Sequence, residues 1–294
     1  MDFDYYQDAA LGTDQFAAKA PKKDDGLLIP LLGIAGETGT LLAEFKKKIR
    51  DRESYAGFKE KAEEEIGDIL WYLSNIASRL ELSLSEIASK NLQKTYERWP
   101  MEGEASGVHA FFDEGLLESE QLPRSIQIRV FETEKGRRAH MSVLPDGTAL
   151  GDALTDNAYD DDGYRFHDVM HLANMAVLRW SPVMRALLKR KRKSQPKLDE
   201  VEDGARAIIL EEMVVAFIYV NAKERSYYKD IKHLDSEMLA TIKRIVGHLE
   251  VRQRRTKDWE QAIQQGYAAF RHLLDKREAV LKLDLTKRQL SIVQ

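Results

Sequence analysis

Two stretches near the start of the chain decide the fold: GETGTLLAE at residues 36–44 and EEEIGDILWY at residues 63–72. Both combine carboxylates with large apolar side chains at helical spacing. From residue 66 to residue 77, apolar side chains recur every three or four positions, which is typical of a helix with one face in a core. Residues 31–99 therefore predict packed helices that carry acids beside their apolar faces.

The second stretch carries a pair of carboxylates on one face. Glu65 and Asp68 are three positions apart, so their side chains project from the same side of a helix. A carboxylate pair beside a buried stripe is unfavourable unless a positive charge lies between its members. A divalent metal ion with oxygen ligands would supply that charge. The alternative is an exposed acidic run, because Glu63 and Glu64 directly precede the pair.

Several separated segments of residues 1–100 together resemble the MazG family, which are all-α nucleoside triphosphate pyrophosphohydrolases. The segments agree with the family in order and spacing, and they include the opening helix with Tyr5-Tyr6-Gln7. The positions that carry the resemblance are Glu37, then Glu65 and Asp68, then Asn91, Lys94 and Arg98.

The resemblance implies a reaction and a site. Family members hydrolyse a nucleoside triphosphate, NTP or dNTP, to the monophosphate and pyrophosphate. Four carboxylates in an E-x-x-E and an E-x-x-D motif hold magnesium, with manganese as the alternative ion. Here the resemblance implies Glu37, Glu65 and Asp68 as catalytic residues and metal ligands, while Thr40 stands where the family has its second Glu. The family usually assembles its helices from more than one chain, which implies a homo-oligomer, either a dimer or a tetramer.

Glu44 is the candidate substitute for the missing carboxylate and a candidate metal ligand. It lies two turns after Glu37, a rise of about 10 Å, which is too far for both side chains to bind one ion on a straight helix. We therefore expect Glu44 to serve a second ion, a bound water or a salt bridge. Pairing with Lys47 or Lys48 on a solvated face is the alternative.

A third helix supplies the candidate substrate-binding residues. Ser83 opens a capping-box pattern at the start of this helix. Lys94 and Arg98 follow four positions apart, so both can approach a polyphosphate from one face. Asn91 is the candidate for sugar or base contacts. The alternative for the two cations is a local ion pair with Glu97.

Composition excludes several classes of protein. The 294 residues allow one large or two ordinary domains, and the net charge of −4 argues against bulk nucleic-acid binding. The absence of cysteine excludes disulfides, thiolate nucleophiles and Cys-ligated zinc. The acidic start of the chain lacks a signal-peptide pattern, and we see no apolar run of membrane-spanning length. We therefore expect a cytoplasmic protein with no membrane partner.

The expected fold class is mainly α, in two domains. Residues 1–100 form an N-terminal all-α MazG-like helical bundle, residues 101–124 a Gly- and acid-rich linker, and residues 125–294 a C-terminal helical domain with a small β-hairpin. Alternating residues at 125–131 predict the first hairpin strand, and residues 139–144 the return strand. The remaining helices are expected at about 164–180, 182–193, 203–223, 235–256 and 258–283. The segment 203–223 is apolar almost all round, which predicts the buried centre of this domain.

The second domain has a candidate site of its own. His167 and His171 are four positions apart, so both imidazoles project from one helical face, as in zinc-binding helices. Asp168 lies between them, and Glu211 interrupts the most apolar helix, where a buried acid needs a partner. One interpretation is a metal site. The other is a buried hydrogen-bonded network that includes Arg206 and orients the helices.

The function predicted from these patterns is magnesium-dependent NTP pyrophosphohydrolysis. The second domain also resembles a helical domain found behind MazG modules in systems of bacterial conflict with phage, which suggests nucleotide-pool control or anti-phage defence. Two alternatives remain: a nucleotide-binding sensor whose site is degenerate at Thr40, and a nucleic-acid-associated module. The last rests on a basic cluster, residues 185–197, for which a solvated face is the competing interpretation.

Overall fold

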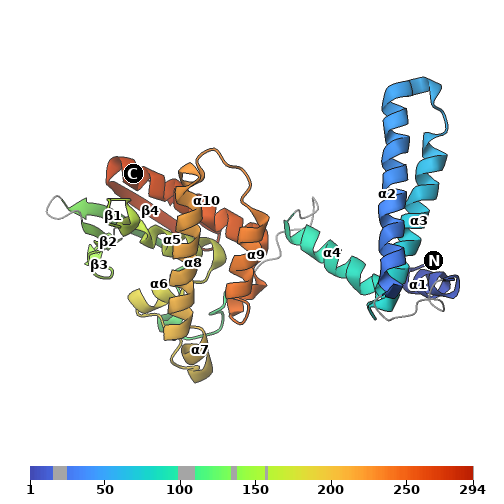
Figure 1. The fold of residues 1–294 in the computed structure, drawn as a ribbon. Helices are drawn as coiled ribbons and strands as arrows, with labels where there is room; N and C mark the ends of the chain where they lie inside the picture. The colour runs from blue at the N-terminus through green and yellow to red at the C-terminus, as the bar shows by residue number, and fades with distance from the viewer. Residues whose placement is uncertain (16–24, 99–109, 134–137, 156–157, 294) are drawn as a thin grey trace. The chain divides into compact units, whose positions relative to one another are not determined.

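The structure is a computed structural model, and it describes the chain except for residues 16–24, 99–109, 134–137, 156–157 and 294. The chain divides into two compact units, Met1–Tyr96 and Glu97–Gln294. Figure 1 shows that the first unit is built from helices and that the second combines helices with a small sheet. The expected fold class, mainly α with a small β element, is confirmed.

The first unit is organised around a helical hairpin. Helix α2 (Asp25–Asp51) and helix α3 (Phe58–Arg79) lie side by side and are joined through a 3-10 turn at Arg52–Ser54. Helix α1 (Phe3–Gly12) packs against α3. Helix α4 (Leu84–Arg98) follows α3 and leads away from the hairpin in Figure 1. The two acidic stretches thus lie on neighbouring helices.

Gln7 fixes α1 to the junction between α3 and α4. Its amide nitrogen donates to the carbonyl oxygen of Leu82 at 2.8 Å and to Ser78 Oγ at 3.0 Å. Its amide oxygen accepts from the backbone nitrogen of Leu84 at 2.8 Å. One side chain therefore satisfies polar groups at the end of one helix and the start of the next.

The hairpin leaves a large apolar surface uncovered. The segment Gly26–Ser54 is long and apolar enough to cross a membrane by length and composition, and only 6% of its most apolar window is buried. This corrects the prediction that no apolar run reaches such a length. Ile66 and Leu73, which we predicted in a core-facing stripe, are also exposed. The exposed apolar side chains of α2 and α3 are Leu28, Ile29, Leu31, Leu32, Leu42, Phe45, Ile49, Ile66 and Leu73.

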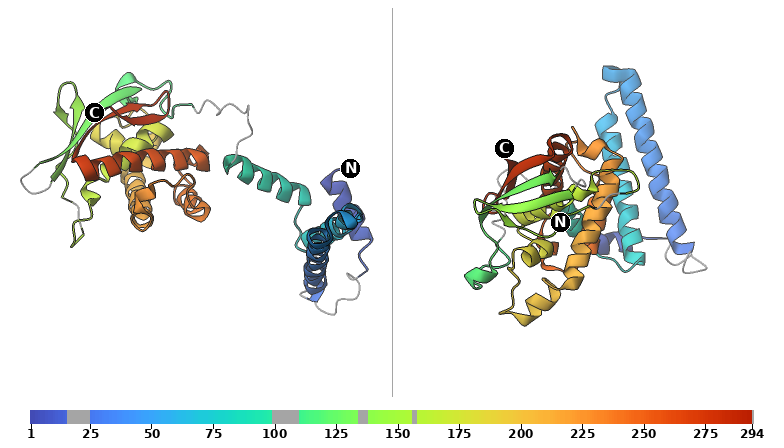
Figure 2. Two further views of the ribbon diagram at one scale, coloured as in Figure 1. Left: turned by 90° about the horizontal axis from the view of Figure 1, so that it is seen from above. Right: turned by 90° about the vertical axis from the view of Figure 1, so that its left-hand side faces the viewer.

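The second unit contains a five-stranded antiparallel sheet in the order β3-β2-β1-β4-β5. The predicted hairpin is present as the first two strands, and three further strands were not predicted. Helix α10 packs against the last two strands and against α5 (Figure 2). The strands are β1 (Ser125–Thr133), β2 (Arg138–Leu144), β3 (Thr148–Ala149), β4 (Glu278–Asp284) and β5 (Gln289–Ile292).

Several predicted helix boundaries are wrong. The last predicted helix ends at Lys276, not at residue 283, because Arg277 adopts a left-handed conformation (φ 62°) and the chain then turns into β4. The predicted helix at 164–180 is interrupted, since a π-helical turn at Asn174–Leu178 follows α5. The helices are α5 (Asp168–Ala173), α6 (Pro182–Leu187), α7 (Pro196–Val201), α8 (Ala205–Lys223), α9 (Ser236–Ile245) and α10 (Thr256–Lys276). The 3-10 turns are Glu118–Glu120, Tyr164–Phe166, Ser226–Tyr228 and Glu250–Gln253.

Helix α8 is only partly buried, contrary to the prediction of an all-round core helix. Val214, Val215 and Ile218 are buried, but Met213 and Val220 are exposed, the latter by 61%. The helix therefore has an inner and an outer face, and residues on its edges border solvent.

The predicted linker is shorter than expected. Residues 101–109 lie outside the described residues, but residues 110–124 pack into the second unit. Asp113 is buried, accepts from the backbone nitrogen of Leu122 at 2.8 Å, and forms ion pairs with Arg124 and Arg185, both at 2.8 Å. The carboxylate of Asp113 is buried in this polar-looking segment because it has three partners.

The basic cluster is not a uniform solvated face. Arg185 and Arg192 are buried, and Arg192 pairs with Asp203 and with Glu250 at 2.8 Å each. The charges of these two arginines are therefore neutralised inside the protein, so neither side chain belongs to a phosphate-binding surface.

Candidate functional site

The first candidate site lies on the α2–α3 hairpin. Glu65 is 7% exposed, and its carboxyl group shares a hydrogen bond with that of Glu37 on the neighbouring helix. Burial, then this contact, then the charges of Glu37, Glu64 and Asp68 raise the pKa of Glu65. The structure therefore brings two of the predicted metal ligands into contact and surrounds them with negative charge.

The charge of Asp68 acts on Glu65 and on a residue of α1. Asp68 is exposed, and its charge contributes, after burial, to a raised pKa of Tyr6. Tyr6 was not predicted as a site residue; its only signal was its place in the opening helix of the family resemblance. Tyr6 thus borders the carboxylates from a third helix.

Thr40 and Glu44 do not join the carboxylate pair. Thr40 is exposed, and its hydroxyl donates to the carbonyl oxygen of Gly36, one turn back, at 3.3 Å. Glu44 is 6% exposed, and it pairs with Lys47 at 2.5 Å and accepts a hydrogen bond from Tyr55. Those two hydrogen bonds lower the pKa of Glu44. The ion-pair alternative for Glu44 is therefore present in the structure, and its metal role stays a prediction.

The substrate-binding candidates lie on α4. Asn91 and Lys94 are exposed, and neither has a side-chain hydrogen bond or ion pair with another described residue. The side chain of Glu97, the alternative ion-pair partner of Lys94, lies outside the described residues. The side chain of Arg98 lies outside the described residues.

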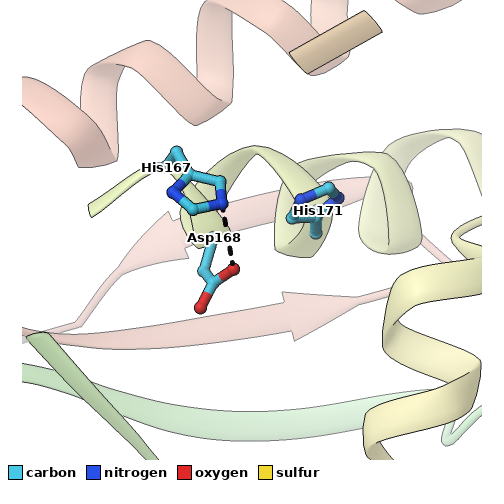
Figure 3. Close-up of side chains that lie close together, drawn as sticks. All are labelled: His167, Asp168 and His171. Carbon is cyan, nitrogen blue, oxygen red and sulfur yellow. Dashed lines mark ion pairs between the residues drawn. The ribbon is translucent and has the colours of Figure 1, made fainter. Parts of the chain in front are cut away.

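The second candidate site lies at the start of α5. His167 immediately precedes this helix, and Asp168 and His171 follow on its first turn (Figure 3). Each of the three offers one ligand atom, and these atoms lie within 4.8 Å of one another. His167 Nε2 is 3.7 Å from Asp168 Oδ1, the contact drawn in Figure 3. The predicted grouping of two imidazoles and one carboxylate is thus a feature of the structure.

His171 lies between two glutamates of α8. It is fully buried, with Nδ1 3.0 Å from Glu211 Oε1 and Nε2 3.3 Å from Glu212 Oε2. Neither contact has the geometry of a hydrogen bond. Burial by itself lowers the pKa of His171, but the two carboxylates outweigh it and raise the pKa to about 10.

Glu211 is held behind His171. Its carboxylate accepts from Asn174 Nδ2 at 3.1 Å, from Ser181 Oγ at 2.9 Å and from the backbone nitrogen of Val183 at 3.0 Å. A fully buried carboxylate with three donors is satisfied as an anion. Glu211 therefore supports His171 and does not face outward.

Glu212, and not Glu211, is the glutamate that faces both histidines. Its Oε2 is 3.8 Å from His167 Nε2 as well as 3.3 Å from His171 Nε2. The sequence did not distinguish Glu212 from Glu211. The two are adjacent on a helix that is apolar almost all round, so the pattern did not show which side of that helix faces the histidines. Arg206, expected in a buried network, is exposed on α8.

Comparison with known proteins identifies the second unit. The family profile of the MazG C-terminal domain matches residues 107–294. The chain belongs to the MazG family. Gene 37 protein of Mycobacterium phage L5 is 30% identical over 101 residues, which are 33% of this chain and 89% of that protein. No solved structure matches the chain. The match confirms the expected MazG family and the expected resemblance of the second domain to a domain found behind MazG modules, whereas residues 1–100 lie outside the matched range.

Proposed function

We propose that this MazG family member hydrolyses a nucleoside triphosphate to the monophosphate and pyrophosphate in a magnesium-dependent reaction. The observation that carries the proposal is the contact between Glu37 and Glu65, two carboxyl groups brought together from separate helices with Asp68 beside them. Like charges packed this closely are stable only with a proton or a cation between them. The donor set is all oxygen, which fits magnesium, with manganese as the alternative.

Each residue then has a distinct role. Glu37, Glu65 and Asp68 would hold the ion. Magnesium bound there supplies an activated water and neutralises phosphate charge. Lys94, which has no ion-pair partner among the described residues, offsets charge on the leaving pyrophosphate. Glu44, already paired with Lys47, holds the far end of the hairpin in place.

The uncovered apolar side chains of α2 and α3 support a homo-oligomer, a dimer or a tetramer. Ile66 is 55% and Leu42 64% exposed, although each belongs to a helix that also carries the carboxylates. Exposed apolar surface of this extent on a soluble protein marks an interaction surface. A second copy of the chain would cover it and complete the bundle. With this surface covered, we propose a cytoplasmic protein without a membrane partner. Light scattering that finds only monomers at micromolar concentration would contradict this part of the proposal.

The decisive experiment separates the products. The protein is incubated with a panel of NTPs and dNTPs plus Mg²⁺ or Mn²⁺, and pyrophosphate is resolved from phosphate. Pyrophosphate release that stops with chelator supports the proposal. Nucleotide binding without turnover would instead support a sensor with a degenerate site. Similarity to a phage protein favours nucleotide-pool control or anti-phage defence as the setting, which dNTP levels in infected cells with and without the protein would test.

A further inference from the structure

We propose that His167, Asp168, His171 and Glu212 form a second metal site, in the MazG C-terminal domain, for a first-row transition-metal dication. The site is independent of the carboxylates in the first unit. It uses two imidazole nitrogens and one carboxylate oxygen from the start of α5, drawn in Figure 3, and one carboxylate oxygen of Glu212 on α8.

The spacing of the four donors matches a shared ion. The nitrogen–oxygen distances are 3.3 Å for His171 and Glu212, 3.7 Å for His167 and Asp168, and 3.8 Å for His167 and Glu212. Ligands bound to one zinc-sized ion at about 2.0–2.2 Å lie roughly 3.3–3.6 Å apart at tetrahedral angles. The donors are therefore close enough for one ion with small side-chain movements.

His167 is held in the orientation that a ligand needs. Its Nδ1 lies 2.9 Å from the carbonyl oxygen of Tyr164, so Nδ1 carries the proton and Nε2 presents its lone pair. The ring of Tyr164 stacks on the imidazole at a centroid distance of 4.5 Å. Histidine ligands in proteins are typically fixed through their second nitrogen in this way.

His171 supplies the independent sign of a ligand. The residue is fully buried, and its two ring nitrogens lie 3.0 Å and 3.3 Å from the two glutamates of α8, in each case without the angles of a hydrogen bond. Nδ1 faces Glu211, which three donors hold in place, and Nε2 faces Glu212. Metal-binding histidines are typically supported in this way: a carboxylate holds one ring nitrogen, and the other ring nitrogen faces the metal. A cation beside Nε2 would satisfy the buried nitrogen and offset Glu212.

The competing explanation is an imidazolium at His171 between its two glutamates. It accounts for the contacts of His171 but not for those of His167. The Nε2 atom of His167 is 3.7 Å and 3.8 Å from its two carboxylates, beyond hydrogen-bond distance. A metal ion explains why the Nε2 atoms of both His167 and His171 face Glu212.

The donor set defines the class of ion. Imidazole with carboxylate suits zinc, iron(II) or manganese, whereas magnesium prefers oxygen ligands alone. The Glu212 side chain is 42% exposed, so the site opens to solvent on that side. An ion there can therefore exchange with solution.

The test uses the full chain with Glu65→Gln and Asp68→Asn, which removes the carboxylates of the first site. Co²⁺ is titrated and its visible absorption recorded, because nitrogen ligands change that spectrum. We expect about one equivalent of Co²⁺ to bind, to be displaced by Zn²⁺, and to be lost in His171→Ala. The control is His233→Ala, whose side chain is 76% exposed and does not belong to the group of His167, Asp168 and His171.

A second variant decides the question if His171→Ala does not fold. Glu212→Gln changes a partly exposed side chain and keeps its shape, so it should fold, which circular dichroism would verify. We expect at least about tenfold weaker Co²⁺ binding, and loss of the Zn²⁺-induced rise in Tm that the parent shows. The proposal is overturned if the parent binds no Co²⁺, or if Glu212→Gln binds it as tightly as the parent.

Discussion

Glu65 on α3 shares a hydrogen bond with Glu37 on α2, and burial together with this contact raises the pKa of Glu65. The relationship joins the two acidic stretches across the hairpin. Two carboxyl groups in contact require a proton or a cation between them. We therefore expect substitutions in this pair to remove metal binding without unfolding the protein.

Glu65→Gln should abolish magnesium-dependent turnover and leave the fold intact. The amide can still hydrogen-bond to Glu37 but cannot neutralise a dication, so we expect a loss of at least about 100-fold in kcat/KM. Asp68→Asn should act in the same direction. Pyrophosphate release at limiting Mg²⁺ is the measurement, and circular dichroism monitors the fold.

The matched control is Glu63→Gln, an exposed acid on the same helix. It removes one negative charge from α3 without touching the pair. Equal losses in Glu63→Gln and Glu65→Gln would mean that only the overall charge of the helix matters, and the assigned site would be wrong.

Local patterns predicted much of the first unit. The hairpin helices were predicted because their amphipathic period is set by neighbours within a few residues. The predicted cap at Ser83 is present, with its Oγ accepting from the backbone nitrogen of Glu86 at 3.2 Å. The prediction failed where burial is not set by the local pattern, because Ile66 follows the apolar period and is nevertheless exposed.

Non-local pairing explains what was missed in the second unit. Strand β4 pairs with β1, and Val130 lies opposite Ala279 although the two are far apart in sequence. Nothing within a short window shows that contact. Likewise, the apolar residues of α8 do not indicate which side of the helix faces the rest of the protein. The sequence therefore could not show that Glu212, and not Glu211, faces His167.

Thr40→Glu should lower the Mg²⁺ concentration that gives half-maximal activity. Thr40 is exposed one turn after Glu37, and it takes the place of the family's second glutamate. A carboxylate there adds an oxygen ligand beside the pair. Thr38→Glu is the matched control, because it adds the same charge to an exposed position off that face. An unchanged or higher half-saturation in Thr40→Glu would show that position 40 does not face the ion.

Gly33→Ala should destabilise the first unit. A Cβ at Gly33 on α2 would overlap the ring of Tyr72 on α3. Overpacking of this kind costs about 1–3 kcal/mol. Gly36→Ala on the same helix meets nothing within 4 Å and should be neutral or stabilising by up to about 1 kcal/mol. Urea unfolding of both variants gives the comparison, and a Gly33→Ala variant as stable as Gly36→Ala would show that α2 and α3 do not pack this closely.

Asp113 should make the stability of the second unit depend on pH in the acid range. Burial by itself raises the pKa of Asp113, but its hydrogen bond from Leu122 and its pairs with Arg185 and Arg124 outweigh burial and lower the pKa below the ordinary value. The folded state therefore binds the proton less well than the unfolded state. The stabilisation is complete above the unfolded pKa of about 3.9 and is lost as the pH falls through the folded value.

Asp113→Asn tests this directly through the free energy of unfolding measured at several pH values. The variant removes the 2.8 Å carboxylate partner of the buried Arg185 and leaves the longer pair with Asp203 at 3.8 Å, so we expect it to be less stable by about 3 kcal/mol at neutral pH. The difference from the parent should shrink as the pH falls below about 4, because the parent then loses the same charge. Asp152→Asn, at an exposed acid of the same unit, should follow the parent at every pH. A constant difference between Asp113→Asn and the parent across this range would show that the Asp113 charge does not stabilise the fold.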